Sequence, residues 1–64
     1  MMLVIGYRGT PDWSKVKASI KRCLGFHATD IEKIVKTIRS GQSCQIPDDF
    51  VLHDELKELG LILK

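Results

Sequence analysis

LGFHATDIE, residues 24–32, separates two runs whose apolar residues are spaced as on helices. Gly25 predicts the end of the first helix, because glycine adopts the left-handed cap conformation without a Cβ penalty. Thr29 and Glu32 have the spacing of a capping box, in which the Thr29 hydroxyl accepts from the Glu32 amide at the start of the second helix. His27 is therefore interpreted as part of a corner between helices and not as a reactive group.

The two flanking helices each have one apolar stripe. The first is expected to begin at Pro11, where a missing N–H costs nothing, with Thr10 as its cap, and its apolar stripe falls within residues 12–24. The second is expected to stop at residues 40–41. The stripes consist of Trp13, Val16, Ile20, Cys23 and Leu24 in the first helix, and of Ile31, Ile34, Val35 and Ile38 in the second.

Three short runs are rich in strand-forming residues, namely 2–7 (MLVIGY), 43–46 (SCQI) and 61–63 (LIL). The last of them is apolar enough to be expected inside a sheet. A third helix is predicted between the second and third strands, with Asp48 or Asp49 as its cap and Gly60 at its end. Its apolar positions are expected to be Phe50, Leu52, Leu56 and Leu59.

The order β-α-α-β-α-β predicts an α+β fold, a small two-layer sandwich in which three helices cover one face of a three-stranded antiparallel sheet. The 64 residues leave room for a single domain, residues 1–64, with one core. The longest uncharged apolar run, residues 1–7, is far shorter than the roughly 20 residues of a membrane span and lacks the features of a signal peptide. A soluble, cytoplasmic protein without membrane contact is therefore expected.

Catalytic and metal chemistry lack a supporting residue pattern. Cys23 precedes His27 by four residues, but it falls on the apolar stripe, whereas a nucleophilic thiol needs exposure and a lowered pKa. His53 lies among acidic residues on the expected wet face of the third helix. Two cysteines and two histidines are present without the close pairs typical of zinc sites, and Cys23 and Cys44 are expected to be reduced thiols. No catalytic residue, metal site or cofactor is predicted.

The charge is distributed unevenly along the chain. Residues 1–39 contain eight basic and three acidic side chains, whereas residues 40–64 contain two basic and five acidic ones. A basic face on the first two helices is expected to bind a protein partner with an acidic surface, because complementary charge steers association. The residues predicted to bind this partner are Lys15, Lys17, Lys21, Arg22 and Lys33.

Nucleic acid is the alternative ligand of this basic helical face. Two short helices joined by a glycine-containing turn are similar to a helix-turn-helix, and their exposed sides are basic. However, the second helix also carries Asp30 and Glu32, and a net charge of +2 provides little attraction for phosphates. An open sheet edge offers a further docking route, by strand addition or by self-pairing, so a monomer or a weak homodimer is expected.

The residues from Val16 to Val35, and the order of elements around them, resemble the C-terminal domain of the bacterial ribosomal stalk protein. The related ClpS adaptor shares the fold. Residues 56–63 (LKELGLIL) look like the L-x-x-x-G-A-x-V close of the stalk family, although Ala18 and Glu32 stand where its pattern has lysines. The resemblance implies the two-layer fold and a non-enzymatic adaptor or regulator linked to translation or to a protease–chaperone machine. The positions that match the stalk pattern are Val16, Ile20, Lys21, Gly25, Phe26, Ala28, Ile31, Ile34 and Val35.

Overall fold

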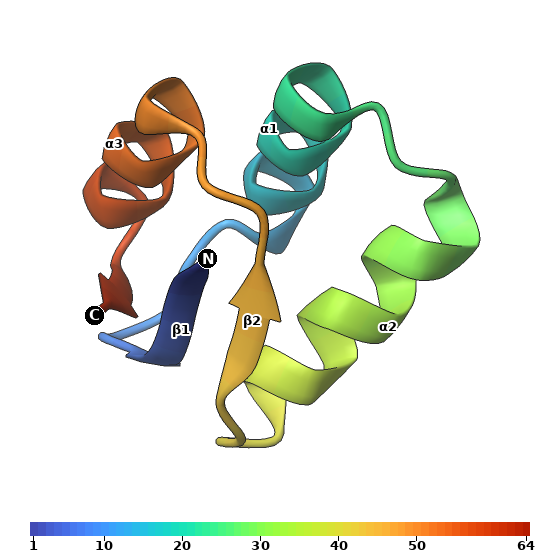
Figure 1. Ribbon diagram of the computed structural model, residues 1–64. Coiled ribbons are helices and arrows are strands. Elements are labelled where there is room, and N and C mark those ends of the chain that lie inside the picture. The colour runs from blue at the N-terminus through green and yellow to red at the C-terminus, as the bar shows by residue number, and fades with distance from the viewer.

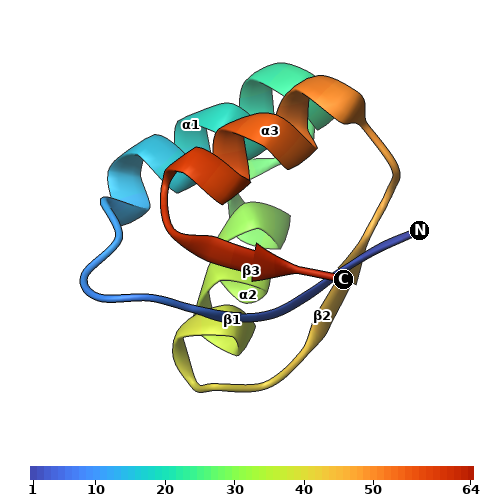
Figure 2. The same cartoon turned by 90° about the vertical axis from the view of Figure 1, so that its left-hand side faces the viewer.

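The computed structural model describes residues 1–64 and confirms the expected order of elements (Figure 1). Its strands form one antiparallel sheet in the order β2-β1-β3, and the helices pack against one face of this sheet (Figures 1 and 2). The two-layer α+β prediction is therefore correct. The elements are β1 (Met2–Tyr7), α1 (Trp13–Leu24), α2 (Ala28–Arg39), β2 (Cys44–Ile46), α3 (Phe50–Glu58) and β3 (Leu61–Leu63).

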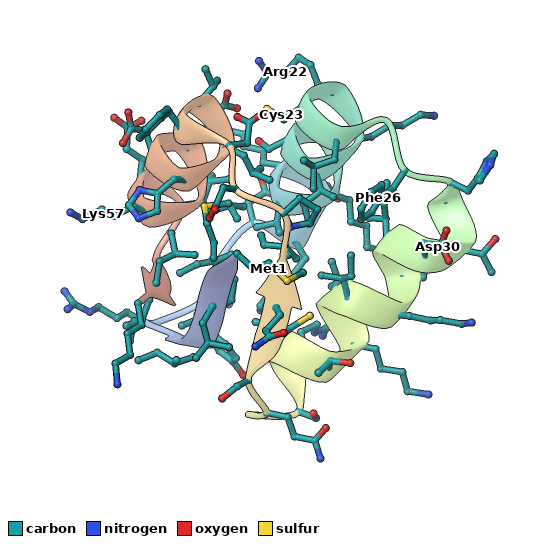
Figure 3. The ribbon with its side chains drawn as sticks, viewed as in Figure 1. Met1, Arg22, Cys23, Phe26, Asp30 and Lys57 are labelled. Atoms are coloured by element: carbon teal, nitrogen blue, oxygen red, sulfur yellow. The ribbon has the colours of Figure 1, made fainter.

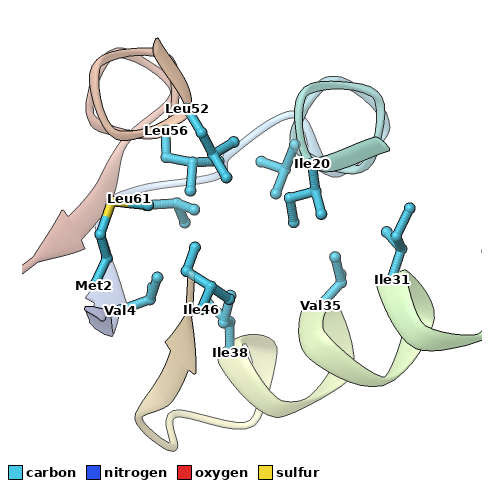
Figure 4. Close-up of a cluster of buried hydrophobic side chains, with 11 residues drawn as sticks. Met2, Val4, Ile20, Ile31, Val35, Ile38, Ile46, Leu52, Leu56 and Leu61 are labelled. Atoms are coloured by element: carbon cyan, nitrogen blue, oxygen red, sulfur yellow. The ribbon is translucent and has the colours of Figure 1, made fainter. Parts of the chain in front are cut away.

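A single apolar core lies between the sheet and the helices (Figure 4). The helix α2 packs on β1 and β2, α3 packs on β3, and α1 lies between α2 and α3, where it completes the helical layer. None of the three helices has the length and apolar content needed to cross a membrane. The core consists of Met2, Val4, Val16, Ile20, Ile31, Val35, Ile38, Ile46, Leu52, Leu56 and Leu61.

The central strand of the sheet is β1, which pairs with both shorter strands. Met2 lies opposite Ile46 of β2, and Val4 lies opposite Leu63 of β3. The expectation that β3 lies inside the sheet is therefore wrong, because β3 forms an edge. The strand is apolar because Leu61 packs into the core beneath α3, and not because β3 has a strand partner on each side.

The pairing of β1 with β3 is irregular between Val4 and Gly6, where β1 has one residue more than β3. One extra residue in a strand moves every following side chain to the other face. Tyr7 accordingly meets Trp13 edge-to-face, with 5.1 Å between ring centroids, and its hydroxyl donates to the Arg39 carbonyl over 3.3 Å. The Arg39 guanidinium also lies 5.5 Å from the centre of the Trp13 ring. These contacts join β1 to the beginning of α1 and the end of α2.

The start of α1 differs from the prediction. Asp12 is the N-cap, and its carboxylate accepts from the amide of Ser14 over 3.1 Å. Thr10 and Pro11 both precede the helix, and Pro11 is buried beside Gly60 of the α3–β3 turn. Thr10 is thus not the cap, because a carboxylate placed directly before the helix provides the acceptor for the free amides of the first turn.

The corner between α1 and α2 is present, but its capping box is not. Gly25 ends α1 with a φ of 68°, as predicted. The N-cap of α2 is His27, whose side chain makes no capping hydrogen bond, and Thr29 already lies within the first turn. The Glu32 carboxylate instead accepts from Lys17 Nζ over 2.7 Å, so it joins α2 to α1 and does not cap its own helix.

The third helix is capped by Asp49, whose carboxylate accepts from the Leu52 amide over 2.9 Å. Phe50, which the sequence places among the apolar positions of this helix, does not pack in the core, because its side chain is 93% exposed. Phe50 is the first residue of α3, and the apolar contacts of this helix are made by Leu52 and Leu56 on its inner side.

Candidate functional site

The five predicted partner-binding residues lie on three parts of the surface. Lys17 and Lys21 border a hollow between α1 and α2, whereas Lys15 and Arg22 border a hollow between α1 and α3. Figure 3 shows Arg22 on the side of α1 that faces α3. Lys33 is exposed on α2 and borders neither hollow. The five cations therefore do not form one continuous face, because α1 lies between two helices and points its basic residues to both.

The hollow between α1 and α2 has a volume of about 140 Å³ and an apolar floor. Two exposed alanines, one from each helix, keep it shallow, and a largely buried isoleucine lies beneath them. An adjoining hollow of about 230 Å³ shares Lys17 and Glu32 with it and continues toward the end of α2. Together the two hollows are lined by Lys17, Ala18, Lys21, Ala28, Ile31, Glu32, Val35, Lys36 and Arg39, which we call the α1–α2 surface.

Lys36 and Arg39 were not among the predicted partner-binding residues, although the sequence contains a signal for them. They follow Glu32 by four and seven positions, which places all three on one side of a helix. Glu32 is bonded to Lys17 of α1, so this side of α2 is the one beside α1. Lys33, one position after Glu32, points elsewhere.

The α1–α2 surface is cationic despite its ion pair. It carries Lys17, Lys21, Lys36 and Arg39 against the single acid Glu32. The Lys17 and Glu32 side chains are 37% and 63% exposed, and ion pairs in such contact with water contribute only about 0.2–1 kcal/mol. A carboxylate of a partner can therefore replace Glu32 beside Lys17 at a small cost.

The opposite side of α1 is held to α3 by a carboxylate. Glu55 accepts from the hydroxyl of Ser19 over 2.9 Å and forms an ion pair with Arg22. Ser19 is buried, and Glu58 borders the same hollow together with Lys15. Acidic side chains of the chain itself thus already face Lys15 and Arg22, which makes this side of α1 a poorer place for an acidic partner than the α1–α2 surface.

Replacing Glu55 by alanine is expected to lower the free energy of unfolding by about 1–2 kcal/mol, because the buried Ser19 hydroxyl would lose its acceptor. Urea denaturation followed by circular dichroism measures this loss. Glu58→Ala is the matched control, since it removes the same charge from the same hollow and should change stability by less than about 0.5 kcal/mol. Equal losses in the two variants would show that the Ser19–Glu55 bond does not contribute.

The nucleophilic side chains are poorly suited to reaction. Both cysteines are free thiols. Burial raises the pKa of Cys23, the carboxylates of Asp49 and Glu55 raise it further, and Arg22 acts in the opposite direction. Burial also raises the pKa of Cys44. Since the thiolate is the reactive form, both groups are weak nucleophiles at neutral pH.

The two histidines belong to different helices. His27 is exposed at the start of α2, and His53 Nδ1 on α3 lies 3.8 Å from Asp54 Oδ1. No three His, Cys, Asp or Glu side chains come together in a way that could hold a metal ion.

Comparison with protein-family models, curated proteins and solved structures found no match to this chain. The stalk-like and ClpS-like resemblance therefore stays a prediction based on residues 16–35 and 56–63.

Proposed function

We propose that this chain is a non-enzymatic protein-interaction module, an adaptor or regulator, that binds an acidic partner on the α1–α2 surface. The observation that carries this proposal is the meeting of four cations from two neighbouring helices around a shallow apolar floor. Lys17 and Lys21 contribute from α1, and Lys36 and Arg39 contribute from α2. The cations steer an acidic partner, and the floor provides the apolar contact that holds it.

A partner complementary to this surface is an amphipathic helix that carries acidic residues beside a small apolar stripe. Its apolar residues would rest on Ala18 and Ala28, which are too small to obstruct a second helix. Its carboxylates would lie beside Lys17 and Lys21, one turn apart on α1. The resemblance to stalk domains and to ClpS suggests a cytoplasmic translation factor or protease–chaperone machine as the source of the partner.

Reversing the charge at two positions, in the double variant Lys17→Glu/Lys21→Glu, is expected to weaken partner binding by roughly tenfold, because two favourable exposed pairs are lost. Affinity capture from a lysate of the native organism, followed by quantitative mass spectrometry, measures this effect. Lys33→Glu is the matched control, because Lys33 is exposed on α2 and borders neither hollow of the α1–α2 surface. Circular dichroism checks that both variants keep the fold.

A partner recovered equally by the wild type and by the double variant would contradict the proposal. Nucleic acid is the alternative ligand of this surface, since its cations come from two consecutive helices. Fluorescence anisotropy with labelled duplex DNA and single-stranded RNA, at about 50 and 200 mM salt, tests this alternative. A micromolar affinity that falls steeply with salt would replace the protein partner by nucleic acid.

A further inference from the structure

The outer edge of β3 has no strand partner. Gly60 O accepts from the Arg8 amide over 2.7 Å, and the Lys64 amide donates to Leu3 O over 2.8 Å, so these two residues point their backbone groups toward β1. Backbone groups alternate in direction along an antiparallel strand. The N–H and C=O groups of Leu61 and Leu63 therefore point away from β1, toward the open edge.

A groove runs along this edge beneath one side of α3. The part beside β3 has a volume of about 200 Å³ and is lined by Arg8, His53, Lys57 and residues 60–63. His53 also lines a second hollow of about 590 Å³, which includes Met2 and the exposed ring of Phe50. The two hollows thus adjoin at His53, and Figure 2 shows α3 lying above β3 over this stretch.

The two ends of the groove differ in chemistry. Arg8 and Lys57 stand at the end where β3 begins, and neither takes part in an ion pair. The Lys57 side chain points away from α1 (Figure 3), whereas Glu55 and Glu58 border the hollow between α3 and α1. The other end is lined by Met2 and by the almost entirely exposed Phe50, and it is bordered by Asp48 and Asp49. An occupant with carboxylates at one end and an apolar side chain at the other matches both ends.

We propose that the open edge of β3 binds an extended acidic peptide segment of a partner protein by strand addition. The backbone groups of Leu61 and Leu63 extend the sheet, carboxylates of the segment pair with Arg8 and Lys57, and an apolar side chain packs on Phe50. Strand addition supplies affinity through backbone hydrogen bonds, and the flanking side chains supply selectivity. This site is separate from the α1–α2 surface and does not depend on it.

A labelled peptide of about eight residues, long enough for one strand, tests the proposal. It consists of alternating valine and threonine, with phenylalanine at one end and two glutamates at the other, and the control peptide has lysines in place of the glutamates. We expect the glutamate peptide alone to bind, and Arg8→Glu/Lys57→Glu to weaken its binding by roughly tenfold. Lys33→Glu reverses the charge of an exposed residue on α2, outside the groove, and should leave binding unchanged.

Nuclear magnetic resonance locates the bound peptide. The amides of Leu61 and Leu63 should shift and exchange more slowly with solvent, whereas the amide of Ile62, which faces β1, should change little. Absence of binding, equal binding of the lysine peptide, or shifts centred on Lys17 and Lys21 would overturn the proposal. Protection of the edge amides that rises with protein concentration, without peptide, would assign the edge to self-pairing. The Lys17→Glu/Lys21→Glu variant should bind this peptide normally, so failure here is distinct from failure of the proposed function.

Discussion

Replacing Ile38 by alanine is expected to lower the free energy of unfolding by about 2–5 kcal/mol, which is the usual range for truncating a buried isoleucine. The Ile38 side chain is fully buried and points from α2 into the core (Figure 4). Truncation removes apolar contacts and leaves a cavity that close-packed neighbours fill only in part. A chain of 64 residues has a total stability of about 3–10 kcal/mol at roughly 0.05–0.15 kcal/mol per residue. The variant should therefore be largely unfolded at low urea concentrations.

Ile34→Ala provides the matched control on the same helix. The sequence predicted that Ile34 is buried as part of the apolar stripe, but the structure shows that it is only partly buried at the margin of the core. The substitution has the same effect on helix propensity as Ile38→Ala, so the difference between the variants isolates burial. We expect a loss of about 1 kcal/mol for Ile34→Ala by urea denaturation. Equal losses would show that Ile34 contributes as much to the core as Ile38 does.

Gly60→Ala is expected to destabilise the protein by about 2–3 kcal/mol, the second-largest effect. Gly60 has a φ of 100°, which side chains other than that of glycine rarely adopt, and a Cβ there would lie 3.2 Å from the Arg8 carbonyl. This carbonyl belongs to the backbone just after β1, and the Arg8 amide is bonded to Gly60 O. Neither group can move without disturbing the pairing of β1 with β3. Thermal or urea unfolding measures the loss.

Gly41→Ala separates the two causes. Gly41 has a φ of 88°, but an added Cβ would meet nothing within 4 Å. Both substitutions restrict the unfolded chain equally, so that contribution cancels in the comparison. Gly41→Ala should therefore cost only the backbone strain, about 1–2 kcal/mol. A Gly60→Ala loss no greater than this would show that the approach of Arg8 to Gly60 is not constrained.

The order of elements could be predicted because each element has its own local pattern. The apolar spacing around Ile20 and Val35 indicates helices, and Gly25 marks the corner between them. Strand order could not be predicted in this way, since it depends on which strands meet in three dimensions. Leu61 is as apolar as a residue of a central strand, yet β3 lies at the edge of the sheet, and its apolar side chains pack beneath α3.

Helix caps were harder to predict than helices. Thr10 and Asp12 are both good capping residues close to Pro11, and the choice between them depends on where Pro11 is buried beside the α3–β3 turn. The Thr29–Glu32 pattern was misleading for a similar reason. Lys17 of the neighbouring helix binds the Glu32 carboxylate, which the sequence pattern assigned to the cap.

The sequence predicted a basic surface on the first two helices, but it did not predict which residues form that surface. Spacing along α1 indicates which residues share a side of that helix, but it does not indicate which helix packs on each side. Arg22 lies beside α3, where Glu55 pairs with it, whereas Lys21 lies beside α2. Lys36 and Arg39 join Lys21 only because α1 and α2 pack together. The tertiary arrangement, and not the local sequence, decides which cations lie near one another.

The central position of β1 makes this sheet indivisible. Its two other strands, β2 and β3, each pair with β1 and not with each other. Cleavage of the backbone in the turn around Gly41 would leave a first fragment with one strand and a second fragment with two strands that are not neighbours. Neither fragment alone has a sheet on which its helices could assemble, so the two halves of the chain can build the sheet only together.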